Sequence, residues 1–169
     1  FITAASGAVG TWIVQLSKWI GAEVIGTCGP DNVEWVESLK ADTVLDYTKT
    51  NVKEWASVEG NKVDLAIDCF GGKSLEDAWW VVKKGATLIS IYQPPEQKMP
   101  AGVEGNINYL FFIMESKGDQ LQKVTDLINT GFGKTALDSS FPIDQFQEAF
   151  AKLKSGKTKG KVVIGLGVN

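Results

Sequence analysis

Short apolar segments alternate with segments of helical periodicity along most of this chain, and this alternation constrains the fold more than any other feature. Segments suited to β-strands lie at residues 1–5, 23–27, 43–47, 63–67, 86–91 and 109–114. Helices are predicted between them, at residues 11–20, 32–39, 52–58, 75–82 and 121–128. Strands joined through helices run parallel and are covered on both faces. The sequence therefore predicts an α/β fold with a doubly wound parallel sheet.

Two stretches interrupt this pattern in the second half of the chain. Residues 83–85, Lys-Lys-Gly, carry the cations and the glycine typical of a helix end, so the helix at 75–82 is expected to close there. Residues 93–105 are rich in Pro and Gly and are predicted to form a loop.

The last part of the chain does not fit the sheet. An extended segment, a helix and a strand are predicted at residues 137–141, 143–153 and 161–166. The predicted sheet is already complete with six strands, so these segments are not needed to build it. We therefore expect a dinucleotide-binding Rossmann domain at residues 1–132, and a return segment at residues 133–169 that packs on an absent catalytic lobe.

The first strand runs at once into a glycine-containing turn and a helix, which is the context in which such a turn indicates dinucleotide binding. Gly7 would let the backbone approach a pyrophosphate, and Gly10 would let the helix lie close to the strand. Ala5 stands where the pattern usually has its first glycine, and a turn that serves only packing is the alternative. The predicted pyrophosphate-binding residues, with amides at 7–10 facing the anion, are Ser6, Gly7, Ala8, Val9 and Gly10. Because the strand has no lead-in, we expect the chain to be a piece of a longer protein.

Composition excludes several kinds of chemistry. All 17 basic residues are Lys and the chain has no His, so imidazole catalysis, His metal ligation and Arg clamps are excluded, and no metal site is expected. A net charge of −3 gives no reason to expect nucleic acid as a partner. No apolar run reaches the roughly 18 residues that a membrane span needs. Cys28 and Cys69 indicate reduced thiols at the edge of the core, and hence an intracellular location. A cytoplasmic protein is expected, and the sequence leaves an organelle open.

Three parts of the chain resemble medium-chain dehydrogenase/reductases: residues 4–10, 63–72 and 141–163. The zinc-independent quinone oxidoreductase-like branch is the most similar, and residues 27–32 and 41–47 are similar to fungal trans-acting enoyl reductases. The resemblance implies the cofactor-binding domain of a two-domain oxidoreductase, whose N-terminal catalytic lobe is missing here. Such enzymes transfer hydride from a nicotinamide to a quinone, an enone or enoyl group, or an activated carbonyl.

The resemblance also assigns further cofactor contacts. Cys69, Phe70 and Gly71 would lie along the cofactor near the adenosine ribose and the diphosphate, although they can equally well cap a core strand. The residues implied to border the nicotinamide are Ile91, Tyr92, Phe111, Phe112 and Ile113, and core packing is the alternative for these aromatic side chains. Tyr92 is the candidate proton donor, and the other catalytic groups would come from the missing lobe.

The end of the second strand bears on the choice between the two nicotinamide cofactors. An NAD enzyme usually carries an acidic residue there, which accepts hydrogen bonds from the ribose hydroxyls. Residues 26–29 are Gly-Thr-Cys-Gly, so NADP is predicted in preference to NAD. In NADP-binding members of the family a Ser, a cation and a Tyr gather here, and only Tyr47 matches. The predicted contacts at this end are Thr27, Cys28, Gly29, Asn32 and Tyr47.

The expected partners are a small-molecule substrate and a second copy of the chain. Residues 109–114 form a candidate edge strand, and we expect a homodimer to form through it. Two other functions stay open: a non-catalytic module that senses NAD(P), and a methyltransferase, which shares a glycine-rich first turn. A methyltransferase usually needs an acidic residue after the second strand, and the segment after residue 109 does not suit one.

Overall fold

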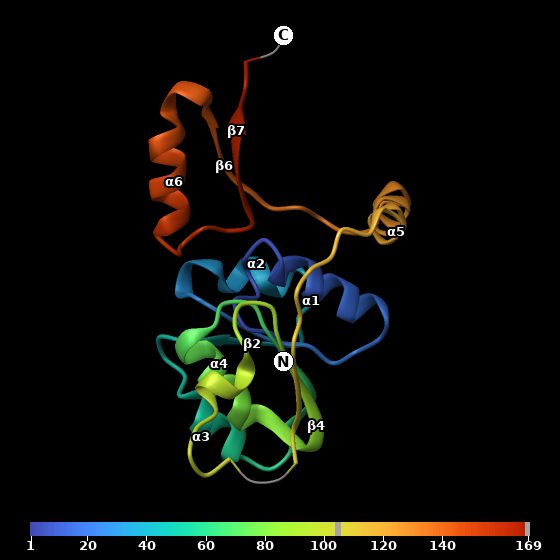
Figure 1. The fold of residues 1–169 in the computed structure, drawn as a ribbon, viewed down its shortest axis with the longest axis vertical. Coiled ribbons are helices and arrows are strands. Elements are labelled where there is room, and N and C mark those ends of the chain that lie inside the picture. The colour runs from blue at the N-terminus through green and yellow to red at the C-terminus, as the bar shows by residue number, and fades with distance from the viewer. Residues whose placement is uncertain (104–105, 168–169) are drawn as a thin grey trace.

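The computed structural model describes residues 1–103 and 106–167, and Figure 1 shows their fold. Residues 104 and 105 of the predicted loop, and residues 168 and 169 of the predicted return segment, lie outside this description. The elements follow in the order α1 (Gly10–Trp19), β1 (Ile25–Cys28), η1 (Pro30–Asn32), α2 (Val33–Ser38), β2 (Thr43–Asp46), α3 (Val52–Ser57), β3 (Val63–Asp68), α4 (Gly72–Val81), β4 (Val82–Ser90), η2 (Pro95–Lys98), β5 (Asn108–Phe111), α5 (Gly118–Asn129), β6 (Leu137–Pro142), η3 (Ile143–Gln145), α6 (Phe146–Lys154) and β7 (Lys161–Gly165).

The first residues of the chain form the centre of the main sheet. Ile2 bridges Gly26 of β1 on one side and Ile67 of β3 on the other, in parallel register on both sides. The Ile2 N–H donates to Ile25 O at 2.8 Å, and the Ile67 N–H donates to Phe1 O at 2.8 Å. The order is therefore β2, β1, residues 1–3, β3, β4 and β5, and the pairings are parallel. This is the strand order of a doubly wound Rossmann sheet, as the alternation of apolar segments predicted.

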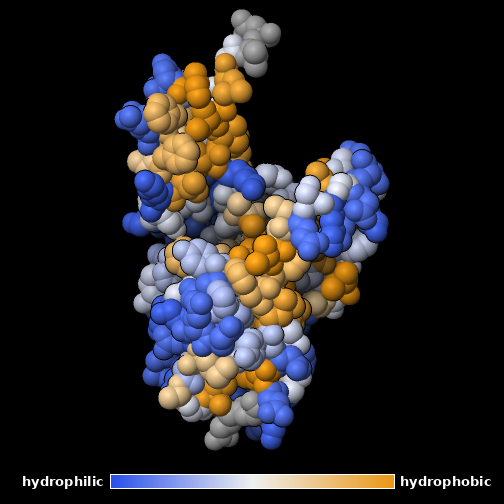
Figure 2. Space-filling model, viewed as in Figure 1, coloured by the Kyte–Doolittle hydropathy of each residue, from blue (hydrophilic) through white to orange (hydrophobic). Residues whose placement is uncertain are grey.

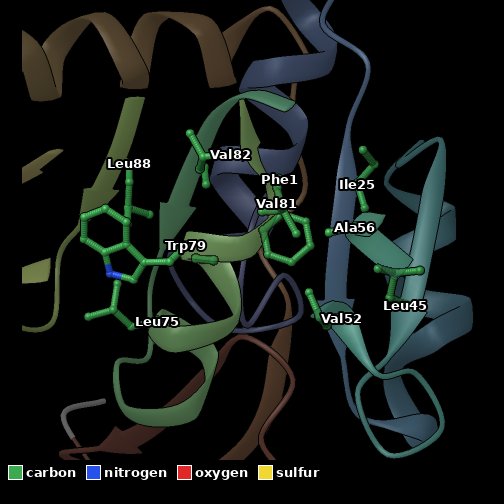
Figure 3. Close-up of a cluster of buried hydrophobic side chains, with 12 residues drawn as sticks. Phe1, Ile25, Leu45, Val52, Ala56, Leu75, Trp79, Val81, Val82 and Leu88 are labelled. Atoms are coloured by element: carbon green, nitrogen blue, oxygen red, sulfur yellow. The ribbon is translucent and has the colours of Figure 1, made fainter. Parts of the chain in front are cut away.

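Each face of the sheet has its own buried cluster. On one face, α1 and α2 cover a core that includes Val14 and Val36. On the other face, α3 and α4 cover a core centred on Trp79. Figure 3 shows Trp79 of α4 beside Leu75 and Leu88, and its Nε1–H donates to the Pro95 carbonyl at 3.1 Å. Helices on both faces leave the ends of the strands open for a site.

The predicted end of the fourth helix is wrong. α4 ends at Val81, and Val82 already begins β4 instead of closing the helix. The register against β3 passes from Val63↔Val82 to Leu65↔Thr87, so residues 83–86 form an irregularity within the strand. Gly85 has φ +80° and donates to Asn106 O at 2.7 Å, so its left-handed backbone serves this irregularity and not a helix C-terminus. The predicted strand at 109–114 is also displaced, because β5 ends at Phe111.

A second, smaller arrangement follows the sheet, which we call the C-terminal unit (residues 137–165). It consists of the parallel pair β6 and β7 with α6 beside them, and Figure 1 shows it standing apart from the main sheet, while α5 projects to the other side. The Gly160 N–H donates to Ser6 O at 2.9 Å, which fastens the unit to the glycine turn. None of the helices in the described part of the chain is long and apolar enough to cross a membrane.

Candidate functional site

The turn between the first strand and α1 has the close packing that its glycines require. A Cβ on Gly10 would lie 2.8 Å from Ala5 Cα and 2.9 Å from the Ala4 carbonyl carbon, both of them backbone atoms. A Cβ on Gly7 would lie 3.2 Å from Ala4 O. Ala4 takes a left-handed backbone with φ 48°, which is uncommon for a residue with a side chain. Gly10 therefore allows α1 to begin directly against the strand.

The amides of this turn are partly available to an anion. The Gly7 N–H donates to Ala4 O at 2.9 Å, so the expectation that all four amides of residues 7–10 are free is wrong for Gly7. Within residues 1–103 and 106–167, the N–H groups of Ala8, Val9 and Gly10 have no acceptor. They lead into the N-terminus of the ten-residue helix α1, with Val9 as its N-cap and Gly10 as its first residue, where unpaired amides and the helix dipole favour negative charge. Three adjacent amides are thus free to bind a phosphate.

A cleft of about 670 Å³ opens at the carboxyl ends of the strands, where ligands bind in sheets of this kind. It is lined by residues from the first strand and the turn after it, from the end of β1 and η1, from the segment 47–52 that follows β2, from α4 and the turn before it, and from the C-terminal unit. Seven of the predicted site residues line it: Ser6, Thr27, Cys28, Gly29, Asn32, Tyr47 and Phe70. The other predicted residues do not line it, namely Gly7, Ala8, Val9, Gly10, Cys69, Gly71, Ile91, Tyr92, Phe111, Phe112 and Ile113.

The end of the cleft beside β1 and β2 presents the Tyr47 phenol and the backbone of Gly29. A Cβ on Gly29 would come within 3.0 Å of Tyr47 Oη, so the hydroxyl lies directly over the glycine. Thr27 and Cys28 line the cleft although both are buried. Asp31 also lines it and is exposed, which places a carboxylate two residues beyond Gly29. This end can accept a polar ring with hydroxyl groups.

Both cysteines are protonated at neutral pH. Burial raises the pKa of Cys69 to about 12, and the neighbouring charge of Asp68 adds to the effect. Burial also raises the pKa of Cys28 to about 11, helped by Asp46 and Glu37. Because the thiolate is the reactive form, neither thiol is a nucleophile in the folded chain. Their contribution is packing beside the cleft.

Asp68 organises the edge of the sheet next to the cleft, and sequence reasoning missed it. This fully buried carboxylate accepts hydrogen bonds from three hydroxyl groups: Thr3 Oγ1 at 2.7 Å, Ser74 Oγ at 2.9 Å and Ser90 Oγ at 3.0 Å. The Gly71 N–H donates to it as well, at 2.9 Å. A buried charge is tolerated only when its hydrogen bonds are satisfied, and here the donors come from three segments of chain. Asp68 therefore fixes the first strand, the turn before α4 and the end of β4 to one another.

The residues expected around the nicotinamide lie along the neighbouring strand ends. Phe70 and Tyr92 are stacked, with ring centroids 6.3 Å apart, and both rings are exposed. Gly71, with φ +77°, allows this approach, because a Cβ there would lie 2.8 Å from Tyr92 Cε1. The structure thus brings Phe70, Gly71 and Tyr92 together. Phe112 and Ile113 are exposed on the segment that leaves β5, while Ile91 and Phe111 are half-buried.

Several residues that line the cleft carry no sequence signal of their own. Lys73 and Ser74 come from the start of α4, and Lys73 is paired with Asp77. Gly156 and Lys157 reach the cleft from the C-terminal unit, more than 120 residues along the chain from Gly29 and Asn32. From the sequence, the lysines around residue 157 indicate a solvated surface, and it is the family resemblance that implies an approach of their turn to the cofactor.

The strand order and the cleft place this chain in the class of doubly wound Rossmann domains with a binding cleft at the carboxyl edge of the sheet. A family model described as zinc-binding dehydrogenase matches residues 39–164. The chain belongs to the zinc-binding dehydrogenase family. In the described part of the chain, no three His, Cys, Asp or Glu side chains gather into a metal site, so these residues do not fit a zinc ion.

Known proteins agree with this assignment. The chain is 51% identical over 96% of its length to a probable zinc-binding oxidoreductase, mitochondrial, from Arthroderma benhamiae, and covers 50% of that protein. It is 31% identical to the chloroplast envelope quinone oxidoreductase homolog of Arabidopsis thaliana, over 96% of this chain and 51% of the relative. It is 29% identical to the NAD(P)H oxidoreductase RTN4IP1, mitochondrial, of Mus musculus, over 98% of this chain and 47% of the relative.

The fold has counterparts among solved structures. The quinone oxidoreductase from Coxiella burnetii matches 96% of this chain and 51% of its own, with a TM-score of 0.83 and 20% identity. The chain spans about half the length of the curated relatives it matches.

Proposed function

We propose that this chain is the cofactor-binding part of an NADPH-dependent oxidoreductase that transfers hydride to a quinone, an enone or enoyl group, or an activated carbonyl. The observation that carries the proposal is the cleft at the carboxyl edge, which extends from Ser6 beside the glycine turn to Gly29 and Tyr47. Relatives named quinone oxidoreductase homolog and NAD(P)H oxidoreductase support the class of reaction.

The residues present fit a nicotinamide dinucleotide. The unpaired amides of Ala8, Val9 and Gly10 would hold the pyrophosphate, and Tyr47 with Asn32 would face the adenosine ribose. When bound, the nicotinamide supplies the hydride. The part of the chain described here would then bind and orient the dinucleotide, and Tyr92, whose phenol is exposed beside Phe70, would be the local proton donor.

The preference for NADPH rests on the absence of a carboxylate at residues 26–29. An acidic residue at this place would repel a 2′-phosphate and accept from the ribose hydroxyls of NAD. The carboxylate at the end of β2, Asp46, accepts hydrogen bonds from the Thr48 N–H at 2.9 Å and from Thr48 Oγ1 at 2.7 Å. These two bonds lower the pKa of Asp46 and engage its charge within its own turn.

The C-terminal unit supports a second part of the proposal, in which residues 133–169 pack on a catalytic lobe. Figure 2 shows apolar surface over α6 and the strands beside it. Exposed apolar side chains on this unit, or directly after it, are Leu137, Ile143, Phe146, Phe150, Val163 and Leu166. The relatives are about twice as long as this chain, which leaves enough protein to cover that face.

Assembly and location follow as further proposals. β5 pairs with β4 on one side and lies at the edge of its sheet, and Figure 2 shows apolar surface where the chain runs from β5 toward α5. We propose that residues 109–114 pair with their copy in a second chain. The cytoplasmic location stays a prediction, and the mitochondrial and chloroplast names of the relatives support an organelle as the alternative.

Calorimetric titration of the chain with NADPH and with NADH tests the proposed function. We expect both to bind, NADPH more tightly. Tighter binding of NADH would reverse the cofactor preference and keep the function. Binding of neither nucleotide would contradict the assignment of this cleft to a dinucleotide. Turnover with a quinone is then measured on the full-length protein, and nucleotide binding there without turnover would favour a sensing module.

A further inference from the structure

A buried hydroxyl group at the end of β4 holds the backbone of the turn that follows. Ser90 is fully buried, and its Oγ donates to Asp68 Oδ2 at 3.0 Å. The same oxygen accepts the Tyr92 N–H at 3.2 Å and the Gln93 N–H at 3.3 Å. A serine hydroxyl has one hydrogen to donate and two lone pairs. All three are engaged here, and they tie the turn after β4 to the Asp68 carboxylate.

The turn before α4 is held by the same carboxylate. The Gly71 N–H donates to Asp68 Oδ2 at 2.9 Å, and the Phe70 N–H donates to Asp68 Oδ1 at 3.4 Å. The Gly72 N–H donates across to Gln93 Oε1 at 3.1 Å. The two turns are therefore joined through Asp68 and also directly to each other.

Each of these turns carries one exposed aromatic ring. Phe70 is 59% exposed and Tyr92 is 63% exposed, and the planes of the two stacked rings are inclined by 27°. An exposed ring gains little from burial, so burial does not fix its position. The stacking of this pair thus depends on where the hydrogen bonds of Ser90 and Asp68 place the two backbones.

We propose that Ser90 and Asp68 are positioning residues for Tyr92, and this inference rests on the proposed function, in which Tyr92 is the local proton donor. In that reaction a quinone becomes a hydroquinone: Tyr92 Oη gives a proton to its oxygen as the hydride is transferred, and the phenolate regains a proton from water. A proton donor has to lie within hydrogen-bond distance of its acceptor. Ser90 places Tyr92 through its backbone, and Asp68 places the ring of Phe70 on which Tyr92 stacks.

The network also explains why a carboxylate is buried at this edge of the sheet. A buried charge is not required for stability, because well-packed apolar groups of similar volume can often replace it without loss. An apolar group could not accept hydrogen bonds from both turns at once, as Asp68 does with Ser90 and Gly71. The burial of this charge therefore serves the relative position of the two turns.

The first test follows the Tyr92 ring itself. The chain has three tyrosines, Tyr47, Tyr92 and Tyr109, so fluorotyrosine labelling gives one fluorine NMR resonance for each, and Tyr92→Phe identifies that of Tyr92. We expect Ser90→Ala to shift and broaden the Tyr92 resonance alone. Ser90→Thr keeps the hydroxyl group and should leave the resonance in place. Unchanged resonances of Tyr47 and Tyr109 show that the fold is retained.

The second test measures turnover of the full-length protein with NADPH and phenanthrenequinone. We expect Ser90→Ala to lower kcat about tenfold while KM for NADPH stays within about twofold, and Ser90→Thr to retain kcat. In a Tyr92→Phe background, Ser90→Ala should change kcat by less than about twofold, because the phenol that it positions is gone. Ser57→Ala is the control and should leave kcat unchanged, since Ser57 is exposed on α3 and its hydroxyl donates to Glu54 O.

The possible results separate this inference from the function on which it rests. If Ser90→Ala left the Tyr92 resonance unchanged, or moved all three resonances, the inference would be overturned. It would also be overturned if kcat fell equally in the Tyr92→Phe background, or if Tyr92→Phe were as active as the unsubstituted protein. Hydride transfer by the unsubstituted protein would stand in each of these cases. If the unsubstituted protein showed no turnover, the proposed function and this inference would both be overturned.

Discussion

At the scale of single residues, the site depends on glycines at which an added Cβ would clash with backbone atoms. Gly10 begins α1 against Ala4 and Ala5, and Gly160 lies in the same way against Ala136. Neither contact can relax through a flexible side chain, because backbone atoms limit the space. The two glycines lie on opposite sides of the junction between the sheet and the C-terminal unit.

Substituting Gly10→Ala is expected to destabilise the chain by about 2 kcal/mol, since the new methyl group would overlap the backbone of residues 4 and 5. Urea unfolding followed by tryptophan fluorescence measures the change. Gly118→Ala is the control, because Gly118 begins α5 with open space around it. Alanine there should be neutral or stabilise by up to about 1 kcal/mol. Equal stabilities for the two variants would contradict the packing argument.

Asp68→Asn is expected to destabilise the chain by about 2 kcal/mol. The amide would keep one acceptor oxygen and direct an NH₂ group toward hydroxyl and amide donors that now share a carboxylate. Asp64→Asn is the control, because Asp64 is exposed and, among the residues that the structure describes, forms an ion pair only with Lys83. The Asp64→Asn substitution should lower the free energy of unfolding by less than about 0.5 kcal/mol. A small effect at Asp68 in urea unfolding would show that the network does not hold the three segments together.

At the scale of elements, periodicity predicted the strands and helices well and their ends less well. The doubly wound parallel sheet followed from short apolar segments separated by amphipathic ones, because burial of both faces is a property of whole segments. The end of α4 was misjudged, since Lys83, Lys84 and Gly85 have the composition of a helix C-terminus but lie in an irregular part of β4. Local sequence does not distinguish these two uses of the same residues.

β5 and the segment after it give the element-scale prediction. Ile113 is 69% exposed beside the edge strand, so Ile113→Glu should place charges face to face in the proposed dimer. Light scattering after size-exclusion chromatography should show a dimer for the unsubstituted chain and a monomer for the variant. Leu121→Glu on α5, which is 67% exposed, should leave the dimer intact. A monomer in all three cases would overturn the proposed pairing.

At the scale of the whole molecule, sequence reasoning named the glycine turn and several residues that line the cleft, and it missed what the fold brings from far away. Tyr47, Gly29 and Asn32, which line the cleft, could be named because each follows a recognisable strand at a position that the family resemblance singles out. Lys157 and Asp68 could not. The partners of Asp68 span Thr3 to Ser90, and the relation of Lys157 to the cleft depends on a contact between Gly160 and Ser6. Such neighbours arise from topology and leave no local pattern.

The apolar face of the C-terminal unit gives a prediction at this scale. Phe150 is 52% exposed, so Phe150→Ser should change the free energy of unfolding by less than about 0.5 kcal/mol while lowering the binding of a hydrophobic dye. Leu88→Ala, at a fully buried position, should destabilise by about 3 kcal/mol. If Phe150→Ser proved equally destabilising, the face would be part of this chain's own core and not a surface for a catalytic lobe.

The position of residues 1–3 between β1 and β3 has a consequence for the order of folding. The pairings of this segment span distant parts of the chain, since the Phe1 amino group donates to Leu65 O, 64 residues away. A helix can form from neighbours alone, but the two halves of this sheet are joined only when β3 pairs with residues 1–3. Non-local closure of this kind slows folding. Until β3 pairs with it, the segment of residues 1–3 has an unpaired edge, and this edge is a site for aggregation while the domain folds.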